Sequence, residues 1–364
     1  MAELRCTECG VRYPYGEPVF RCSRCGSPLD VLWERPSFSE DLVDRNEQGI
    51  WRFWRFLPPV SRRVSLGEGW TPLVRARRAG REVYLKLEYL MPGGSFKDRG
   101  AAVAVSRAID IGLKRVVEDS SGNAAISTSL YASAAGVEVE VHGPGDMPKG
   151  KASLISSLGA VLVLGGSRSD AHGRAASKRG YIGHLHNPFF IEGISTLIYE
   201  VFLTLRRLPS NIVVPIGSGN LLLAVYRAIK HLDESGLLKR TPRLVGVEAA
   251  GYEEVYAALH GHASGKPGTE VADGMRVRGK PRLRQVVEAV RELGDVVVVG
   301  EDEVLRAWSQ LWSSGFLVEP TSAAAVAGLE EAARLGLLED GDVLLPLTGS
   351  GLKLASELDR LLCR

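Results

Sequence analysis

The amino-acid sequence predicts an α/β protein built on parallel sheets, and three observations support this prediction. Short β-rich runs alternate with Ala- and Leu-rich stretches of helical periodicity from residue 83 onward, a pattern typical of parallel strands joined by helices. Several strand-like runs are apolar without alternation, as expected when helices cover both faces of a sheet. Small polar residues and glycines follow several of these runs, at the edge where such folds bind ligands.

Length and composition favour an ordinary cytoplasmic protein. The 364 residues suggest two or three domains, and 45% hydrophobic with 24% charged residues is usual for a globular chain. A formal net charge of +2 gives no indication of a nucleic-acid partner. We expect no membrane span and no signal peptide, because no apolar run approaches the ~20 residues needed. Scarce Asn and Gln fit a thermophile source, although genomic composition is an alternative reason for the Arg bias.

Four of the five cysteines form a C-x2-C-x12-C-x2-C pattern. Each knuckle, CTECG or CSRCG, turns sharply enough to aim two thiolates at one point, and the glycine permits the turn. Four thiolates complete a tetrahedral zinc site of the structural kind, since no position is left open for water. Two disulfides or four free thiols are the alternatives, and a cytosolic setting argues against disulfides. The expected zinc ligands are Cys6, Cys9, Cys22 and Cys25.

Residues 33–60 are rich in Trp, Arg and Pro, and we expect an arm whose aromatic side chains anchor it to another surface. Beyond this arm, helical stretches such as 99–112 and 123–136 separate most of the expected strands. The predicted strands are 83–88, 114–120, 137–143, 160–166, 211–217, 243–249, 295–300 and 342–349.

Two segments in the first half of this region carry chemistry. Lys97 lies in PGGSFKDRG, on a Gly-rich turn before a helix, where a lysine can form an imine with an aldehyde; a solvated surface lysine is the alternative. Ser120, Ser121, Gly122 and Asn123 form a turn directly after a strand. Backbone N–H groups at such a helix start are a receptor for a carboxylate, and the Asn123 amide can bond a phenolic oxygen. An ordinary helix cap is the alternative.

Two further strand ends follow the same logic. Gly217, Ser218, Gly219 and Asn220 come after a strand and open a helix, which predicts a small phosphate cradle. The Gly-Lys-Ser/Thr of nucleotide-binding loops and the dinucleotide Gly-x-Gly-x-x-Gly pattern are both missing there. Thr348 follows another apolar strand, in LPLTGSGLK, where it can bond a heterocycle nitrogen or cap the last helix.

Taken together and in this order, these segments resemble the fold-type-II family of pyridoxal 5′-phosphate (PLP) enzymes, from about residue 65 to 356. LGEGWTPL, GSFKDRG, SSGN, NPFFIEG, EPTSAAAVAGL and LTGSGLK are most similar to the segments of threonine synthases. The leading Cys-knuckle segment is similar to that of archaeal-type members. The resemblance implies a tryptophan synthase β-like fold with two doubly wound parallel-sheet domains and a short zinc-ribbon-like segment.

The resemblance also implies a role for each segment. Lys97 would hold PLP as a Schiff base and move protons, and Asn123 would bond the ring hydroxyl. The loop from Gly217 to Asn220 would hold the cofactor phosphate. Thr348 would face the ring nitrogen, where a neutral hydroxyl leaves that nitrogen largely unprotonated. The substrate carboxylate would be received by Ser120, Ser121, Gly122 and Ala124.

The reaction implied is that of a carbon–oxygen lyase acting on phosphate, which converts O-phospho-L-homoserine and water to L-threonine and phosphate. It requires a second anion site for the leaving phosphate. Phe190 and Ser195 stand where threonine synthases commonly have Arg and Lys. Ala124 replaces a usual Thr, Met91 replaces a common Asn, and the phosphate loop is one residue shorter than usual. The remaining candidates for binding substrate anions are Lys149, Lys151, Arg276 and Asn187. For each basic residue among them, a solvated surface charge is the alternative.

The missing basic residues leave another reading open: a serine/threonine dehydratase, or a cysteine- or cysteate-synthase-like enzyme that replaces a β-substituent. The short chain beyond LTGSGLK favours a synthase, because dehydratases often carry a regulatory extension. A non-catalytic PLP-fold regulator is disfavoured, since Lys97 and the SSGN segment are both present.

The family implies a homodimer acting on a small amino-acid substrate, with an active site between two domains of each protomer. We expect a zinc-ribbon-like segment and arm over 1–60 and a large PLP-binding domain made of 61–100 and 190–364. The small closure domain would span 101–189.

Overall fold

The computed structural model describes residues 2–358 and divides them into two compact units. Unit 1 comprises residues 2–69 and Met91–Thr196. Unit 2 comprises Trp70–Leu90 and the described residues from Leu197 onward. These units group residues 91–100 with the N-terminal segment. The division at 61–100, 101–189 and 190–364 stays a prediction.

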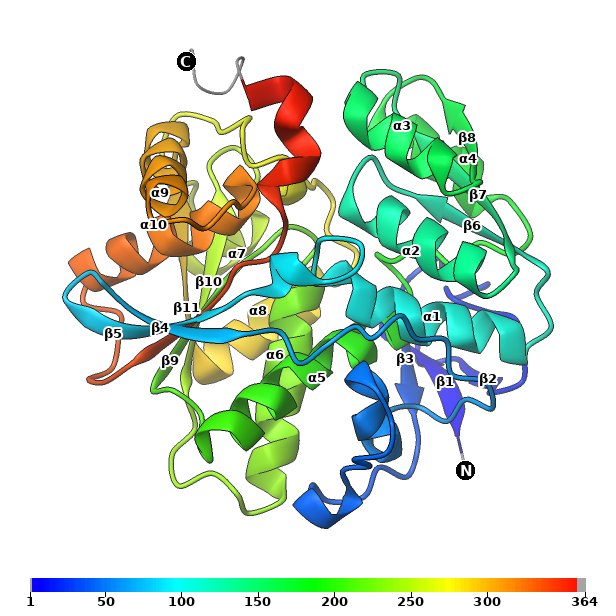
Figure 1. Cartoon of the computed structure of the whole chain (residues 1–364), viewed down its shortest axis with the longest axis horizontal. Coiled ribbons are helices and arrows are strands. Elements are labelled where there is room, and N and C mark those ends of the chain that lie inside the picture. The colour runs from blue at the N-terminus through cyan, green and yellow to red at the C-terminus, as the bar shows by residue number, and fades with distance from the viewer. Residues whose placement is uncertain (1, 359–364) are drawn as a thin grey trace. The chain divides into compact units, whose positions relative to one another are not determined.

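Unit 1 begins with a three-stranded antiparallel sheet in the order β2-β1-β3 (Figure 1). Its strands are β1 (Glu3–Cys6), β2 (Arg12–Pro14) and β3 (Leu29–Leu32). The arm that follows contains two 3₁₀-helices, η1 (Glu40–Leu42) and η2 (Gly49–Phe56). Trp51, Phe53 and Phe56 on η2 are buried, in agreement with the expectation that the aromatic side chains of the arm are packing anchors.

The rest of unit 1 is a small parallel α/β layer in which β7 is the central strand of β6-β7-β8. Helices α1 and α2 pack against each other, and α2 and α4 pack on β7. The strands are β6 (Arg115–Asp119), β7 (Glu138–Gly143) and β8 (Val161–Leu164). The helices are α1 (Lys97–Asp110), α2 (Asn123–Ala134), α3 (Lys149–Ser157), α4 (Arg168–Ala176) and the first half of α5 (Pro188–Leu205).

Unit 2 contains a six-stranded sheet in the order β11-β10-β9-β12-β5-β4, parallel except for the edge strand β4. Helix α10 packs on β9, β10 and β11, and α9 lies beside α10 (Figure 1). The strands are β4 (Leu73–Arg78), β5 (Arg81–Lys86), β9 (Asn211–Pro215), β10 (Arg243–Ala249), β11 (Gly294–Val299) and β12 (Val343–Pro346).

The helical elements of unit 2 connect these strands. Besides the second half of α5, its α-helices are α6 (Asn220–Glu234), α7 (Glu254–His260), α8 (Leu283–Leu293), α9 (Glu301–Ser313) and α10 (Pro320–Arg334). The 3₁₀-helices are η3 (Glu88–Leu90), η4 (Asp273–Met275) and η5 (Gly351–Glu357).

The prediction of parallel sheets wrapped by helices is confirmed. All eight predicted strands are present, and β9 and β12 are buried along their whole length, as their unbroken apolar sequences indicate. Strand β4 was not predicted. In its sequence, LVRARR, arginines alternate with apolar residues, and the strand lies at the edge of the sheet. Ala79 and Gly80, both with positive φ, connect it to β5, as in a tight two-residue hairpin.

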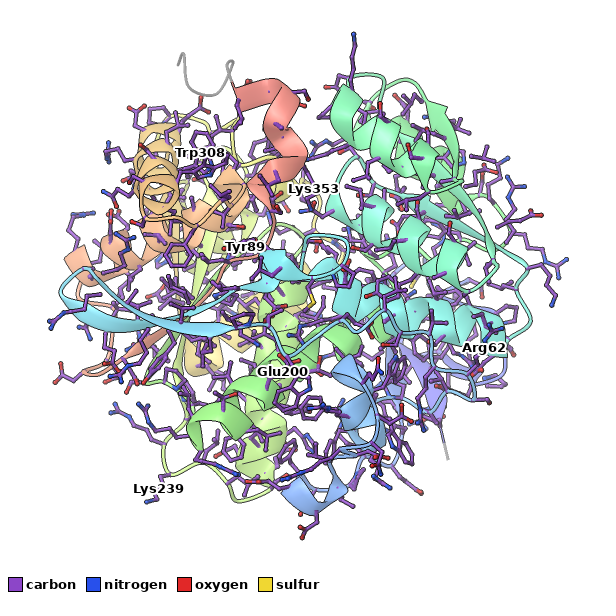
Figure 2. The ribbon with its side chains drawn as sticks, viewed as in Figure 1. Arg62, Tyr89, Glu200, Lys239, Trp308 and Lys353 are labelled. Atoms are coloured by element: carbon purple, nitrogen blue, oxygen red, sulfur yellow. The ribbon has the colours of Figure 1, made fainter. Side chains whose placement is uncertain are left out.

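A buried lysine of unit 2 is paired with an opposite charge. The Lys86 ammonium on β5 donates to Glu200 on α5 at 2.7 Å and to the carbonyl of Thr71 at 2.6 Å (Glu200 is labelled in Figure 2). Helix α5 is the one described helix long and apolar enough to cross a membrane, yet 83% of its apolar window is buried inside the protein. Both observations are those of a core helix that carries a compensated charge.

Candidate functional site

Lys97 is the first residue of α1, and its neighbour Asp98 fixes the turn before it. The Asp98 carboxylate is fully buried and accepts hydrogen bonds from the Gly93 backbone N–H and the Ser127 hydroxyl, both at 2.5 Å. Ser127 lies on α2, one turn beyond Asn123. Asp98 therefore ties the lysine-bearing turn to the helix that begins with Asn123, within unit 1.

Two aromatic rings lie close to the Lys97 ammonium. Its Nζ lies 4.9 Å from the centre of the Phe96 ring and 5.6 Å from that of Phe190. Gly100 makes this packing possible, because a Cβ there would lie 2.3 Å from the Phe190 ring. Phe190 occupies the position where threonine synthases commonly have a basic residue, so no cation comes from this position.

The loop from Ser120 to Gly122 lies at the carboxyl end of β6 and leads into α2. Gly122 is the residue before the helix and provides no side-chain cap, while the Ser120 hydroxyl accepts a hydrogen bond from the Gly122 N–H at 3.2 Å. Ser120 and Asn123 are partly accessible, whereas Ala124 is buried. The loop is held from behind, where the Ser120 N–H donates to the carbonyl of His142 at 3.2 Å.

Lys151, in the first turn of α3, lies against this loop. Its side chain is largely buried, with 4% of the residue exposed, and its Nζ lies 3.7 Å from the position that a Cβ on Gly122 would take. Lys149, two residues earlier, is exposed. The alternative of a solvated charge therefore fits Lys149 but does not fit Lys151.

A hydrogen-bonded pair lies behind the loop, where the His184 Nδ1 is 2.8 Å from a carboxyl oxygen of Glu118. Burial, with a contribution from Asp119, raises the pKa of Glu118 well above its ordinary value. Burial lowers the pKa of His184 to about 3, and the Lys97 ammonium acts in the same direction. Both directions favour the uncharged forms, so this pair adds little negative charge beside Lys97.

Asn187 and Ser195 are both fully buried and bond to backbone. The Asn187 amide donates to the carbonyl of Ile182 and accepts from the N–H of Phe189, each at 3.0 Å. The Ser195 hydroxyl donates to the carbonyl of Glu192 at 2.5 Å. These contacts shape the start of α5, and a substrate-binding role for Asn187 stays a prediction.

In unit 2, the loop from Gly217 to Asn220 joins β9 to α6. Gly219 precedes the helix with a φ of 91°, and a Cβ there would lie 2.4 Å from Val286. A Cβ on Gly217 would lie 2.3 Å from the carbonyl oxygen of Gly274. Both positions therefore require glycine, and the helix start presents backbone N–H groups with no side-chain cap from Gly219.

Thr348 follows β12 and is 1% exposed. Its hydroxyl is 3.0 Å from that of Ser322 on α10, and the Ser322 hydroxyl also bonds to both backbone groups of Gly349. The hydroxyl that caps η5 belongs to Ser350. The alternative role of Thr348 as a helix cap is therefore wrong, and Ser322 orients it.

Arg276 lies just after η4, the segment that packs on Gly217 through Gly274. Its Nε donates to the hydroxyl of Tyr252 at 3.2 Å, and this bond raises the pKa of Arg276. The guanidinium of Arg278 lies 4.7 Å from the centre of the same ring. Two cations thus share one tyrosine within unit 2.

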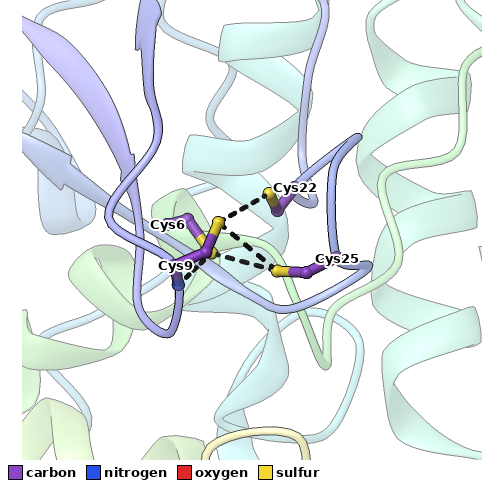
Figure 3. Close-up of side chains that lie close together, drawn as sticks. All are labelled: Cys6, Cys9, Cys22 and Cys25. Atoms are coloured by element: carbon purple, nitrogen blue, oxygen red, sulfur yellow. Dashed lines mark hydrogen bonds between the residues drawn. The ribbon is translucent and has the colours of Figure 1, made fainter.

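The four N-terminal cysteines come together as their spacing predicts. Their sulfur atoms all lie within 4.8 Å of one another, and Figure 3 shows the Cys6–Cys25, Cys9–Cys22 and Cys9–Cys25 contacts, at 3.5, 3.6 and 3.6 Å. Tetrahedral Zn–S bonds of about 2.3 Å would place sulfur atoms about 3.8 Å apart. No disulfide joins these four cysteines, so the disulfide alternative is not supported. Gly10 and Gly26 follow the knuckles with positive φ.

Sequence reasoning missed the residues that hold these segments in place. Asp98, Ser322 and the Glu118–His184 pair are buried, and each bonds a partner 26 to 66 residues away in the chain. The sequence shows that Asp98 follows Lys97 and that Glu118 and Asp119 end an apolar strand. It does not show which residues these acids contact.

Comparison with known proteins agrees with the motifs. A family model described as pyridoxal-phosphate dependent enzyme matches residues 64–349. The chain is 30% identical to the threonine synthase of Methanosarcina acetivorans over 97% of its own length and 92% of that protein. It is also 30% identical to the threonine synthase of Methanocaldococcus jannaschii, over 96% and 92% of the two chains.

Solved structures show the same fold. Threonine deaminase isoform 2 from Solanum lycopersicum superimposes with a TM-score of 0.66 at 25% identity, over 80% of this chain and 82% of that one. Maize serine racemase superimposes with a TM-score of 0.65 at 23% identity, over 80% and 92%. The family match covers most of the chain and includes all the segments that carry chemistry except the four cysteines, so this protein belongs to the pyridoxal-phosphate-dependent enzymes.

Proposed function

We propose that this enzyme is a threonine synthase, which converts O-phospho-L-homoserine and water to L-threonine and phosphate. Two archaeal relatives of that name, similar over nearly the whole chain, support the proposal. The observation that carries it is the buried ammonium of Lys151 beside the Ser120–Gly122 loop. A substrate with both a carboxylate and a phosphate needs a cation of this kind near its carboxylate receptor.

Each unit carries residues that fit a part of PLP. In unit 2, the glycines of the Gly217–Asn220 loop leave the backbone N–H groups of the α6 start open to a phosphate. Thr348 offers a buried hydroxyl oriented by Ser322. In unit 1, Lys97 offers the amine, and Asn123 offers an amide at the start of α2. When bound, the cofactor would supply a sink for the electrons released at the substrate Cα.

The chain's own residues perform the remaining work. The Ser120–Ala124 segment would bind the substrate carboxylate at the α2 start, through backbone N–H groups beyond that of Ser120, which donates to His142. The Lys97 amine would take the proton from Cα and return protons later in the cycle. Loss of a proton from Cβ would then supply the electron pair that expels the phosphate from the γ-carbon. Lys151 would hold the phosphate as the γ-carbon–oxygen bond breaks, because its ammonium stabilises the charge of the leaving group. Water then adds at the β-carbon to give threonine.

The test compares two lysines of the same helix turn. Lys151→Met should lower kcat/KM for O-phospho-L-homoserine about 10- to 100-fold, the size expected for one charge-assisted hydrogen bond. Lys149→Met, a change at an exposed lysine, should alter it less than about twofold. Equimolar threonine and phosphate would be measured together. The PLP-loaded parent protein releasing neither would contradict the proposed function.

A second measurement separates the phosphate from the carboxylate. The affinity for L-2-aminobutyrate, which has no phosphate, would be followed by the absorbance of the bound cofactor. If Lys151 binds the phosphate, Lys151→Met should leave this affinity within about twofold of the parent value. An equal loss of affinity for O-phospho-L-homoserine and L-2-aminobutyrate would indicate that Lys151 binds the substrate carboxylate instead.

Phe190 and Ser195 favour an alternative within the same family. Because neither is basic, the chain matches a serine/threonine dehydratase, or an enzyme that replaces a β-substituent in the manner of cysteine or cysteate synthases. Serine, threonine, and O-phosphoserine with sulfide or sulfite are the substrates that test it. Arg276, bonded to Tyr252, and Asn187 stay further candidates for substrate binding.

We also propose a structural zinc ion on Cys6, Cys9, Cys22 and Cys25, supported by the sulfur spacing. The Tyr13 hydroxyl lies 3.1 Å from the Cys22 sulfur, as expected for an outer-shell hydrogen bond to a metal ligand. A cytoplasmic homodimer without a nucleic-acid or membrane partner completes the proposal. The largely buried α5 and the formal net charge of +2 support its last two parts.

A further inference from the structure

Arg21 connects the four-cysteine segment to the α/β layer of unit 1. It lies between the buried residues Phe20 and Cys22, and its backbone pairs with Pro28. Its guanidinium donates to the carbonyl of Ala176, the last residue of α4, at 3.0 Å. A cation is favoured at this end of a helix. The same guanidinium lies 6.0 Å from the centre of the Tyr181 ring, within the range of a cation–π contact.

Arg21 contacts helix α4 and Tyr181, and both of these also bind the Asp119 carboxylate. The Tyr181 hydroxyl donates to one Asp119 oxygen at 2.6 Å, and Nδ1 of His172, on α4, lies 2.7 Å from the other. The Tyr181 segment is tied to β6 by two backbone bonds, from Val117 to Gly180 and from Ile182 to Val117, each at 2.9 Å. Asp119 is 8% exposed, so its carboxylate is held from two sides in the interior.

The charges of this group fit an ion pair. Burial is the largest single influence and acts to raise the pKa of Asp119. The hydrogen bond and charge of His172, together with the hydrogen bond from Tyr181 and the charge of His184, outweigh burial, so that the pKa is lowered. The hydrogen bond with Asp119 in turn raises the pKa of His172. Removing a neighbour of a buried, hydrogen-bonded ion pair loosens all its members, because each group depends on the others for its compensation.

Asp119 is the last residue of β6, and Ser120 follows it directly. The position of the Asp119 side chain therefore sets where the Ser120–Gly122 loop begins, at the start of α2. A contact path runs from Cys22 through Arg21 to Tyr181 and α4, then to Asp119 and the loop. Every step in it lies within unit 1.

We propose that Arg21 is a positioning residue, through which the four-cysteine segment holds the Ser120–Gly122 loop in the geometry that binds the substrate carboxylate. The proposal rests on the function assigned to that loop above. It gives the N-terminal segment a part in substrate affinity beyond its own stability.

The experiment compares Arg21→Ala with Arg24→Ala in the PLP-loaded, full-length protein. Arg24 lies in the same knuckle but is exposed, and it makes no ion pair or side-chain hydrogen bond with the described residues. Amide hydrogen exchange of the peptide covering 119–124 is the first readout. The exchange rate should rise about tenfold in Arg21→Ala, because weaker contacts to Asp119 make opening of the loop less costly. In Arg24→Ala it should stay at the parent rate.

Kinetics provide the second readout. KM for the amino-acid substrate should rise about tenfold in Arg21→Ala, with kcat within about twofold of the parent value. Tyr181→Phe keeps the ring and removes one hydrogen bond to Asp119, so both effects should be smaller. Bound zinc, measured in each variant, checks that the cysteine site is intact. Should Arg21→Ala fold poorly, Arg21→Lys keeps the charge and loses the planar guanidinium that contacts Ala176 and the Tyr181 ring together. It should change exchange and KM in the same direction.

The outcomes are distinct. Equal exchange of the 119–124 peptide in Arg21→Ala and Arg24→Ala would overturn the proposal. Faster exchange with an unchanged KM would leave the connection standing and overturn the assignment of the loop to carboxylate binding. Faster exchange together with a raised KM supports both.

Discussion

Glu68 carries a buried carboxyl group that changes its charge near neutral pH. It is fully buried, and its Oε2 accepts hydrogen bonds from the Leu66 N–H at 2.8 Å and the Tyr131 hydroxyl at 3.0 Å. Burial raises the pKa of Glu68 from 4.5 to about 7, because a carboxylate loses hydration in the interior and these bonds compensate it only in part.

This shift links folding to pH. Between pH 4.5 and about 7 the folded protein keeps the Glu68 proton and the unfolded chain does not, so stability falls as the pH rises through this window, by up to about 3 kcal/mol. Glu68→Gln, which has no charge to lose, should match the parent urea midpoint near pH 5 and exceed it near pH 8. A constant difference between the two midpoints at both pH values would show that Glu68 is not the group responsible.

At the scale of single residues, the sequence predicts the chemical groups better than their supports. Lys97, Asn123 and the Gly217–Asn220 loop stand beside turns and strand ends that are recognisable locally. Asp98 and Ser127, which lie 29 residues apart, meet only because α1 packs on α2. Such pairs depend on tertiary packing, which no local pattern encodes.

Gly219 and Gly236 allow a matched test at the two ends of α6. Both have positive φ, 91° and 72°, but a Cβ on Gly219 would strike Val286 at 2.4 Å, while nothing lies within 4 Å of one on Gly236. Gly219→Ala should therefore raise the dissociation constant for PLP by more than about tenfold, because the loop must move. Gly236→Ala should cost about 1 kcal/mol of stability and leave PLP affinity unchanged.

Fluorescence titration of the apoprotein with PLP measures both affinities, and urea unfolding measures both stabilities. Equal PLP affinity in the two variants would show that the Gly217–Asn220 loop does not hold the cofactor. Since both substitutions introduce a methyl group at a position with positive φ, the difference in PLP affinity between them reports chiefly the contact at Val286.

The N-terminal sheet allows a prediction about its metal. Because the segment consists of three short strands, four zinc–thiolate bonds would contribute much of its stability. Purified protein should contain about one zinc per chain, and Cys9→Ser should lose most of it and become sensitive to protease within residues 2–33. Metal analysis of both proteins decides the matter; a parent protein that contains no zinc after purification in zinc-supplemented buffer would contradict it.

Elements with an unbroken apolar pattern were predictable, and elements defined by their partners were not. Strands β9 to β12 are buried on both faces, so their composition alone marks them. Strand β4 carries three arginines and is a strand because β5 pairs with it. Strands β1 and β3 bring the knuckles together, and the sequence indicated only the knuckles.

At the scale of the whole molecule, the sequence predicts the fold class but not which segments form one unit. Residues 91–100 continue into α1 and pack with α2, so they belong to unit 1. No local pattern indicates this grouping, because a boundary between units depends on how the segments pack in three dimensions. The whole chain also has few amide side chains, with five Asn and three Gln among 364 residues.

This scarcity of amides predicts a heat-stable protein, and an ion network offers a test of how the stability arises. Glu331 binds Lys266 at 3.0 Å and Arg334 at 2.8 Å, and Lys266 also binds Glu303 at 2.9 Å. The hydrogen bonds from Arg334 lower the pKa of Glu331, so the contribution of Glu331 to stability is present above pH 4.5 and is lost as the pH falls.

Glu331→Gln should lower Tm by roughly 2–4 °C at neutral pH, since networks of ion pairs contribute more to stability at high temperature. Glu288→Gln, which removes an exposed i,i+4 pair with Arg284, should lower it by less than about 1 °C. Calorimetry at neutral pH and again below pH 4 measures both; equal shifts for the two variants would mean that the network adds nothing beyond a surface pair.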